Sequence, residues 1–407
     1  MLKILFQNTN KVWIEFVLPI LIYFLFSYIY LRNYNITDFW NYADQASYIN
    51  ASRKFYENFY IDPYRTIGYQ FLLGCPSLFN LNLKIIFWPI FVNLFCFLIS
   101  INTLSKICLS HSIKPFHVIT ILCLSSSIII HINFALTEIF FISISLLAYK
   151  YFIDLNSYNG KNTDYLKWSF VMSLIALTKP GFLLFTCFFI LTMIIRNRRK
   201  TLYILLPFLI LITSQASAIK FHYGKFKLSY IGSLTYYRYI GSSIESFNTY
   251  NNFTASDFYR IQEQRDRIIK GYSLNQIDSI SNLDYKNYLY NSPLSFSKAY
   301  VNNIVSNTFS SNLDETPFLY GINKIFNIIF TCFPILIFLY GLLKKQIFYT
   351  KLFPYFFIIY TILISGVSSM QGDRFHLVFY PFSILLIVIF ITNLFQNNDR
   401  TVPNREY

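Results

Sequence analysis

The acidic residue in the most suggestive surroundings is Asp44, which lies in a polar stretch between two apolar segments. If residues 39–56 form a helix, the helical period of about 3.6 residues places Asp44 on one stripe with Tyr48, Ala51 and Phe55. A carboxylate among aromatic and small side chains loses part of its hydration, which raises its pKa and suits it to accept a proton. The alternative is an interfacial helix whose Asp44 points to water.

Three basic residues stand near expected turns. Arg65 is followed by Gly68 and Tyr69 and then by an apolar run; its planar guanidinium could bind a phosphate, and the glycine permits a close backbone approach. Lys179 precedes Pro180, which ends a helix, and Arg374 follows Gly372 and Asp373. For Arg65 the alternative is a side chain that extends along the apolar surface to reach the membrane–water boundary.

A second carboxylate, Glu138, follows Thr137 at the start of an apolar stretch. A glutamate in the first turn of a helix is stabilised by the helix dipole, and this explanation requires no function. The functional interpretation is that Glu138 faces the same cavity as Asp44.

The composition indicates the elements that must position these residues. The chain has 407 residues, of which 55% are hydrophobic and 13% are charged, whereas a soluble protein carries about 25% charged residues. A soluble enzyme is therefore excluded; six cysteines are too few for a disulfide scaffold, and the apolar content excludes disorder. We expect an all-α polytopic membrane protein with about ten spans. The candidate spans are 13–31, 85–104, 117–136, 138–153, 167–178, 181–195, 201–219, 324–343, 352–369 and 376–395.

The basic residues predict the orientation of these spans. Clusters such as Arg198-Arg199-Lys200 and Lys344-Lys345 fall between spans on one side, which favours both termini on the cytoplasmic side. The division of 167–195 into two spans at Pro180 is assumed here; a single kinked span is the alternative. Under this topology Lys179 and Arg374 lie in short external turns, which normally avoid cations. Either an anionic ligand or anchoring to lipid headgroups explains them.

Two long segments, 32–84 and 220–323, are then external. We divide the chain into a membrane module at 1–219 that contains the loop 32–84, an external subdomain at 220–323, and a second membrane module at 324–407. The subdomain is expected to be helical, because residues 257–272 favour a helix.

Several other kinds of chemistry have no support in the sequence. No spacing typical of a metal site and no glycine-rich phosphate loop occur, so no cofactor is predicted and a divalent metal is unsupported. The net charge of +15 is spread over the segments between spans instead of forming one stripe, which argues against a nucleic-acid partner.

The order of these features resembles the polyprenyl-phosphate-sugar-dependent glycosyltransferases of the C-type superfamily (GT-C). Their first external loop typically carries an Asp, a Tyr four residues later and an Arg-x-x-Gly-Tyr stretch; here these are Asp44, Tyr48 and Arg65-Thr66-Ile67-Gly68-Tyr69. The Thr137-Glu138 start of a span, the Lys179-Pro180 turn and the late Arg374 are also similar. The resemblance covers 38–185 and, more loosely, 370–385.

The chain departs from the family pattern at three positions. Ile67 stands where the family often has Pro, Phe375 stands where it often has Tyr, and Ala43 stands where some members have a second acid. The segment 220–323 matches no part of the pattern.

The resemblance implies a site and a reaction. Asp44 would be the general base on the acceptor hydroxyl, and Arg65, Lys179 and Arg374 would bind the donor phosphate. Tyr48, Tyr69 and Glu138 would shape the substrate site. The donor would be a polyprenyl-phosphate-linked hexose, with undecaprenyl-phosphate-glucose as the best guess. The acceptor would be an O-antigen, lipopolysaccharide or other lipid-linked surface glycan, and the protein would lie among membrane lipids of the bacterial inner membrane with its site facing the periplasm.

Two other functions remain open. An O-antigen polymerase or ligase would place its chemistry on the arginines of the external subdomain, which are Arg238, Arg260, Arg265 and Arg267. A transporter or flippase of lipid-linked glycans would carry binding groups near mid-membrane and often repeated halves, and this chain shows neither.

Overall fold

The structure is a computed structural model and describes residues 17–31, 44–79, 87–157, 160–250, 253–310, 317–344, 349–369 and 371–399. Throughout these ranges the elements are helices, with no strand, so the expected all-α class is confirmed. The bundle consists of α2 (Leu18–Leu31), α6 (Phe87–Ser110), α7 (Pro115–Leu124), α8 (Ser126–His131), α9 (Glu138–Ser157), α10 (Asn162–Thr178), α11 (Leu183–Arg196), α12 (Thr201–Tyr223), α18 (Pro317–Leu343), α19 (Tyr349–Ser365) and α20 (Tyr380–Asp399).

The apolar helices are typical of a membrane protein. Within the described ranges, four helices are long and apolar enough to cross a membrane: Phe87–Ser110, Arg198–Tyr223, Leu319–Leu343 and Leu377–Leu394. Shorter apolar helices occur at Leu18–Ile29, Ile67–Phe79, Pro115–Leu124, Pro180–Arg196 and Lys351–Ser365. In the bundle core, Tyr149 of α9 stacks on Phe353 of α19, and the same phenylalanine contacts Phe185 of α11.

The expected span 117–136 is interrupted. It forms the two short helices α7 and α8, which are separated by Ser125 with extended backbone angles, and residues 132–137 are irregular. Asn323 of α18 compensates for the break, because its Oδ1 accepts hydrogen bonds from Ser126 Oγ at 2.8 Å and from the Ser127 backbone N–H at 3.1 Å. The buried backbone amide at the break is thereby satisfied, as an apolar environment requires.

Residues 167–195 form two helices, as assumed from Pro180. α10 ends at Thr178, and the short 3-10 helix η3 (Pro180–Phe182) leads into α11, which contacts α10. Lys179 is held in this turn with an extended backbone.

The described part of the segment 32–84, which we expect to be external, contains the helices α4 (Gln45–Asn58) and α5 (Ile67–Gly74). Asp44 is the residue that precedes α4, and the part of the expected helix at 39–43 lies outside the described residues. α4 ends where Phe59 adopts a left-handed conformation with a φ of 51°.

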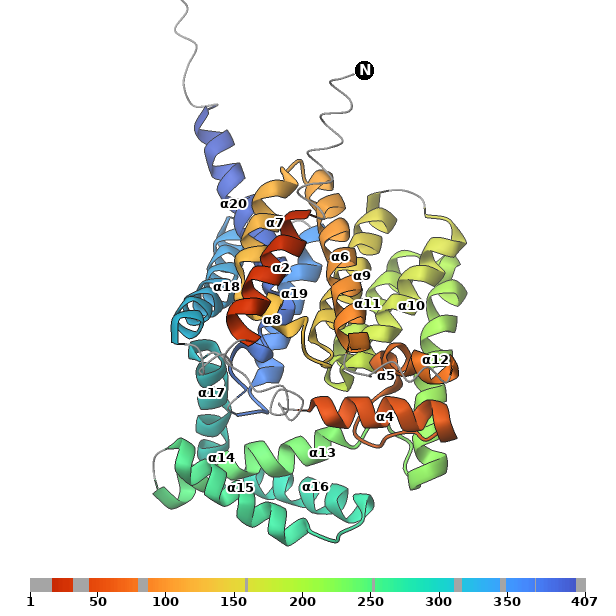
Figure 1. Ribbon diagram of the computed structural model, residues 1–407, viewed down its shortest axis with the longest axis vertical. Helices are drawn as coiled ribbons and strands as arrows, with labels where there is room; N and C mark the ends of the chain where they lie inside the picture. Colours follow the sequence, from red (N-terminus) through yellow and green to blue (C-terminus); the bar gives the residue numbers. More distant parts are fainter. Residues whose placement is uncertain are drawn as a thin grey trace, which may run out of the picture.

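The segment 220–323, for which we keep the name external subdomain, is helical in its described parts, as expected. It contains α13 (Ile231–Thr235), a π-helical turn η5 (Tyr236–Ile240), α14 (Gly241–Tyr250), α15 (Ala255–Ile269), α16 (Leu274–Asn291) and α17 (Pro293–Phe309). The helix expected at 257–272 is α15, which begins after Thr254, whose side chain accepts a hydrogen bond from the Asp257 N–H. In Figure 1, α13–α16 and α4 lie at one end of the bundle, and the end of α20 lies at the other.

Candidate functional site

The expected base Asp44 is bridged by two arginines. Arg65 Nη2 lies 2.7 Å from Asp44 Oδ1, and Arg374 Nη2 lies 3.4 Å from Asp44 Oδ2. The Asp44 side chain is 41% exposed, whereas those of Arg65 and Arg374 are 12% and 15% exposed. The Asp44 carboxylate is therefore the most accessible of the three side chains, and the two guanidiniums lie on its buried side.

Arg374 extends this group to the second carboxylate. Its Nε donates to Glu138 Oε1 at 2.9 Å, and Lys179 Nζ lies 3.5 Å from the same oxygen. Glu138 is buried, and its Oε2 has no hydrogen-bond partner among the described residues. Three cations thus meet two carboxylates, which leaves an excess of one positive charge in this set. We call these five residues the charged cluster: Asp44, Arg65, Glu138, Lys179 and Arg374.

Five separate elements supply the charged cluster. Asp44 precedes α4, Arg65 precedes α5 by two residues, and Glu138 is the first residue of α9. Lys179 lies between α10 and η3, and Arg374 ends the 3-10 helix η6 (Gly372–Arg374). The structure therefore brings together the five charged residues of the site that the family resemblance implies.

The two predicted tyrosines lie behind Arg65. The Arg65 guanidinium carbon is 4.5 Å from the Tyr48 ring centroid, and the Tyr48 and Tyr69 rings meet edge to face at 6.0 Å. Tyr69 is fully buried, stacks on Phe140 and donates its hydroxyl to Asn93 Oδ1 at 2.9 Å. Tyr48 therefore supports the guanidinium by a cation–π contact, while Tyr69 packs in the interior.

The electrostatics of Asp44 differ from the expectation drawn from the helical stripe. Burial alone would raise the pKa of Asp44, but attraction to Arg374 and then to Arg65 outweighs it, so the pKa lies below its ordinary value. The expected raised pKa was wrong, because the stripe indicates burial but not which cations approach from other parts of the chain. Asp44 is consequently ionised at neutral pH and can accept a proton.

Gly68 allows the loop with Arg65 to dock on the turn with Lys179. A Cβ atom at Gly68 would lie 2.9 Å from Thr178 Oγ1 and 3.2 Å from the carbonyl carbon of Leu177. Only glycine fits this approach without displacement of α5. Lys179 itself lies between two rings, with its Nζ 5.5 Å from the Phe141 centroid and 5.6 Å from the Phe375 centroid.

The external subdomain contacts the loop that precedes Arg65. The Tyr230 N–H donates to the Pro63 carbonyl at 2.7 Å, and the Ser229 hydroxyl donates to the Pro63 and Tyr64 carbonyls. Asp62 completes the turn by accepting the Tyr64 and Arg65 N–H groups at 2.8 Å. The backbone position of Arg65 is thus determined from both sides.

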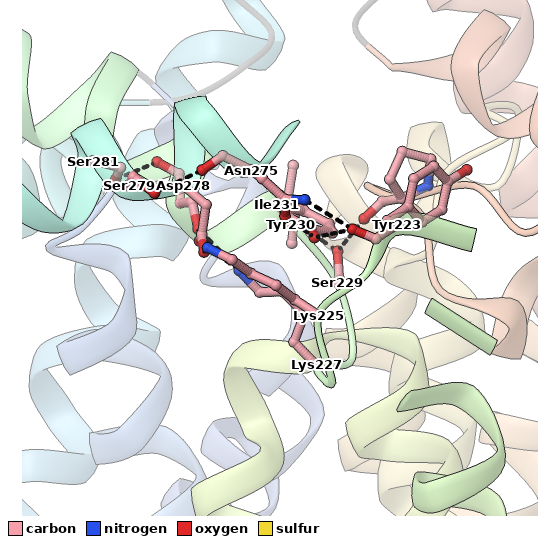
Figure 2. Close-up of polar contacts among 12 residues, drawn as sticks. Tyr223, Lys225, Lys227, Ser229, Tyr230, Ile231, Asn275, Asp278, Ser279 and Ser281 are labelled. Carbon is pink, nitrogen blue, oxygen red and sulfur yellow. Dashed lines mark hydrogen bonds and ion pairs between the residues drawn. The ribbon is translucent and has the colours of Figure 1, made fainter. Parts of the chain in front are cut away.

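Residues 224–230 connect α12 to α13, and we call them the strap. The strap is anchored on α16 (Figure 2). Tyr230 donates its hydroxyl to Asn275 Oδ1 at 2.7 Å, and Lys225 and Lys227 lie 2.7 and 2.5 Å from the two oxygens of Asp278. Asp278 is buried, whereas the side chains of Lys225 and Lys227 are partly exposed, so this carboxylate is the common anchor of the two lysines on α16.

Two amides that sequence reasoning missed attach the first external segment to the bundle. Gln45 Oε1 accepts the Ala135 N–H at 2.8 Å. Asn93 of α6 accepts the Tyr69 hydroxyl through Oδ1, and its Nδ2 donates to the carbonyls of Ile132 and Phe134. Their partners are the irregular residues 132–137. The only available signal was the position of Gln45 beside Asp44.

The arginines proposed for a polymerase or ligase all pair with carboxylates inside the subdomain. Arg265 is buried and binds Glu245, Asp284 and the Tyr237 carbonyl, so its fork is occupied. The other pairs are Arg238 with Asp266, Arg260 with Asp257, and Arg267 with Glu263.

Among the described residues, no group of three His, Cys, Asp or Glu side chains could hold a metal ion. A cavity of about 100 Å³ lies among α18, α19 and α20, with Lys351, Tyr355 and Asn393 in its wall; none of its lining residues belongs to the charged cluster. No protein-family model, curated protein or solved structure matches this chain.

Proposed function

We propose that this protein transfers a hexose, specifically glucose, from undecaprenyl phosphate to an O-antigen, lipopolysaccharide or other surface-glycan acceptor. The observation that carries the proposal is the pairing of a partly exposed carboxylate, Asp44, with Arg65 and Arg374, beside Glu138 and Lys179. This arrangement offers a proton acceptor next to three cationic side chains, which can stabilise the phosphate that leaves when a sugar is transferred.

In the proposed reaction the acceptor hydroxyl attacks the anomeric carbon of the donor. A bond forms from the hydroxyl oxygen to that carbon, the bond from the carbon to the phosphate oxygen breaks, and the hydroxyl proton passes to Asp44. The polyprenyl phosphate leaves with the electron pair of the broken bond. Arg65, Lys179 and Arg374 neutralise the charge that develops on it, and no nucleotide is consumed.

The paired arginines couple donor binding to the basicity of Asp44. Arg65 and Arg374 stabilise the ionised carboxylate and so weaken it as a base. A donor phosphate attracts the same two guanidiniums, and its negative charge offsets theirs at Asp44. Donor binding would therefore strengthen the base at the moment when the acceptor hydroxyl must lose its proton.

Glu138 has a different role in this proposal. It is buried and holds Arg374 and Lys179 through one oxygen, so it orients the phosphate-binding groups. Its other oxygen, Oε2, is buried and has no hydrogen-bond partner among the described residues, so it keeps an unused capacity to accept a hydrogen bond beside the phosphate-binding groups. Tyr48 keeps the Arg65 fork in place, and Tyr69 supports Tyr48.

The proposed location is the bacterial inner membrane, with ten spans, both termini in the cytoplasm and the charged cluster facing the periplasm. The arrangement in Figure 1 supports it, because α4 and the external subdomain lie at the same end of the bundle and the end of α20 lies at the other. Basic residues such as Arg198 and Arg199, between α11 and α12, are typical of the cytoplasmic side.

Mass analysis of the surface glycan tests the proposal against its rivals. Cells with the gene are compared with cells that lack it and with cells that carry Asp44→Asn. One hexose fewer per repeat in both altered strains supports transfer, whereas a loss of chain length indicates a polymerase. The subdomain arginines already pair with carboxylates, which counts against the polymerase reading. An unaltered glycan together with uptake or flipping by the protein in vesicles would indicate transport.

A further inference from the structure

The chain between α19 and η6 is held by a set of buried amides that the reaction does not use. Asn307 of α17 donates its Nδ2 to the carbonyls of Ser365 at 3.0 Å and Ser368 at 2.8 Å, and its Oδ1 accepts the Gln371 N–H at 3.2 Å. One side chain therefore satisfies three backbone groups of this connection. Asn307 is completely buried, so each of these bonds replaces contacts with water that it no longer has.

Two further asparagines extend this contact. Asn303, one turn earlier on α17, donates to the Gly366 carbonyl at 3.0 Å. Asn327 of α18 donates to the Asn307 carbonyl at 2.8 Å, and its Oδ1 lies 3.1 Å from His376 Nδ1. We call Asn303, Asn307 and Asn327 the asparagine clamp. It is tied to the chain on both sides of Arg374, before η6 and just after it.

The clamp matters because Arg374 must meet two carboxylates at once. Its Nε reaches Glu138 and its Nη2 reaches Asp44, at 2.9 and 3.4 Å. A small displacement of η6 would break one contact or the other, since a guanidinium is a rigid planar fork. Asn307 supplies the most backbone bonds to the connection that leads into η6.

We propose that Asn307 is a positioning residue for Arg374, and that the external subdomain, through α17, thereby sets the geometry of the charged cluster. The effect of this on sugar transfer rests on the proposed function, but the positioning itself does not. This positioning gives the segment 220–323 a role in the charged cluster, although the two are far apart in the sequence.

The test measures the titration of Asp44 in purified protein by isotope-edited infrared spectroscopy, with Asp44→Asn as the blank. Arg374→Gln removes a cation that stabilises the Asp44 carboxylate, so the pKa of Asp44 rises. Asn307→Ala is expected to raise the pKa of Asp44 as well, and adding it to Arg374→Gln is expected to cause no further rise. Asn302→Ala is the matched control, because Nδ2 of this neighbour on α17 has no hydrogen-bond partner among the described residues.

The possible results are distinct. The proposal would be overturned if the pKa of Asp44 is unchanged in Asn307→Ala. It would also be overturned if the rise in the double variant equals the sum of the rises in the two single variants. If Asn307→Ala does not fold, Asn307→Gln, which keeps the amide but moves it outward by one methylene, takes its place with the same expectations. If the pKa shifts as expected but the wild-type protein transfers no sugar, the positioning role stands and the proposed function fails.

Discussion

Arg374 Nε lies 2.9 Å from Glu138 Oε1, although 236 positions separate the two residues in the sequence. Because the same guanidinium also reaches Asp44, the two carboxylates are joined through one side chain. Neither carboxylate can move without affecting the other. The charged cluster is thus one electrostatic unit built from both halves of the chain, and its members can be tested individually.

Replacing Arg374 by lysine tests whether the contact with both Glu138 and Asp44 needs a planar guanidinium. Lysine keeps the charge but presents a single point, which cannot reach Glu138 and Asp44 together. Misplacement of such a group by about 1 Å can reduce a rate roughly 100-fold, and we expect kcat of Arg374→Lys to fall on this scale in a transfer assay. Arg267→Lys, at an exposed ion pair of the subdomain, is the control and should keep the wild-type rate. Equal rates for the two variants would argue against the bridge.

The pH dependence of transfer follows from the environment of Asp44. A base must be ionised, so activity falls as the pH drops through the pKa of Asp44, which Arg374 and Arg65 hold below the ordinary range. We expect full kcat/KM, which reports the enzyme before the donor phosphate binds, to persist to lower pH than an unperturbed aspartate allows. Arg65→Gln removes one of these cations, so the acidic limb of the pH–rate profile should move to higher pH. A limb that stays in place would show that another group titrates.

The stability of the fold should respond to acid with the same sign. A carboxyl group whose pKa is depressed by folding stabilises the folded state above its unfolded pKa, and this contribution is lost as the pH falls through the folded pKa. Between these two pKa values, the free energy of unfolding of Asp44→Asn should therefore change less with pH than that of the wild type, as measured by acid unfolding. Equal pH sensitivity of both proteins would mean that Asp44 is not stabilised by folding.

Glu138→Gln tests the buried side of the charged cluster. The substitution leaves Arg374 and Lys179 without their buried carboxylate, and removal of one partner from a buried ion pair costs about 3–5 kcal/mol. We expect a loss of stability of that order, measured from reversible unfolding in mixed detergent. Glu57→Gln removes the carboxylate of an exposed pair with Arg53, for which about 0–1 kcal/mol is typical. A loss no larger than this in Glu138→Gln would contradict the assigned burial.

Gly68→Ala tests the docking of the Arg65 loop on the Lys179 turn. The added methyl group would contact Thr178 Oγ1 and the Leu177 backbone at distances that require a shift. Overpacking of this kind costs about 1–3 kcal/mol, and displacement of α5 should also lower transfer activity. Gly232→Ala is the matched control, since a Cβ there has no neighbour within 4 Å. Comparable stability of both variants would show that the close approach is not required.

The sequence predicted the components of the charged cluster better than their electrostatics. Asp44, Arg65 and Lys179 could be singled out because a charge beside an apolar segment is conspicuous in a chain with few charges. The depressed pKa of Asp44 could not be predicted, since it depends on Arg374, which a local helical period does not include. The break at Ser125 could not be predicted either, because Asn323, which compensates for it, lies on α18.

The asparagine clamp was hidden for a different reason. Asparagine is frequent throughout this chain, so Asn303 and Asn307 did not stand out from the others. Their spacing of four residues places them on one face of a helix, but many polar residues of the external subdomain share such spacing. Only the path of the connection before η6 distinguishes them, and that path depends on tertiary contacts between α17 and α19.

The most direct test of the central claim is sugar transfer by purified protein in vesicles that contain undecaprenyl-phosphate-glucose and a lipid-linked glycan acceptor. Asp44→Asn is compared with Glu57→Gln, which alters a carboxylate on the same helical segment outside the charged cluster. The account predicts a fall of about 10²–10⁴-fold in Asp44→Asn and the wild-type rate in Glu57→Gln. Full activity of Asp44→Asn would contradict it.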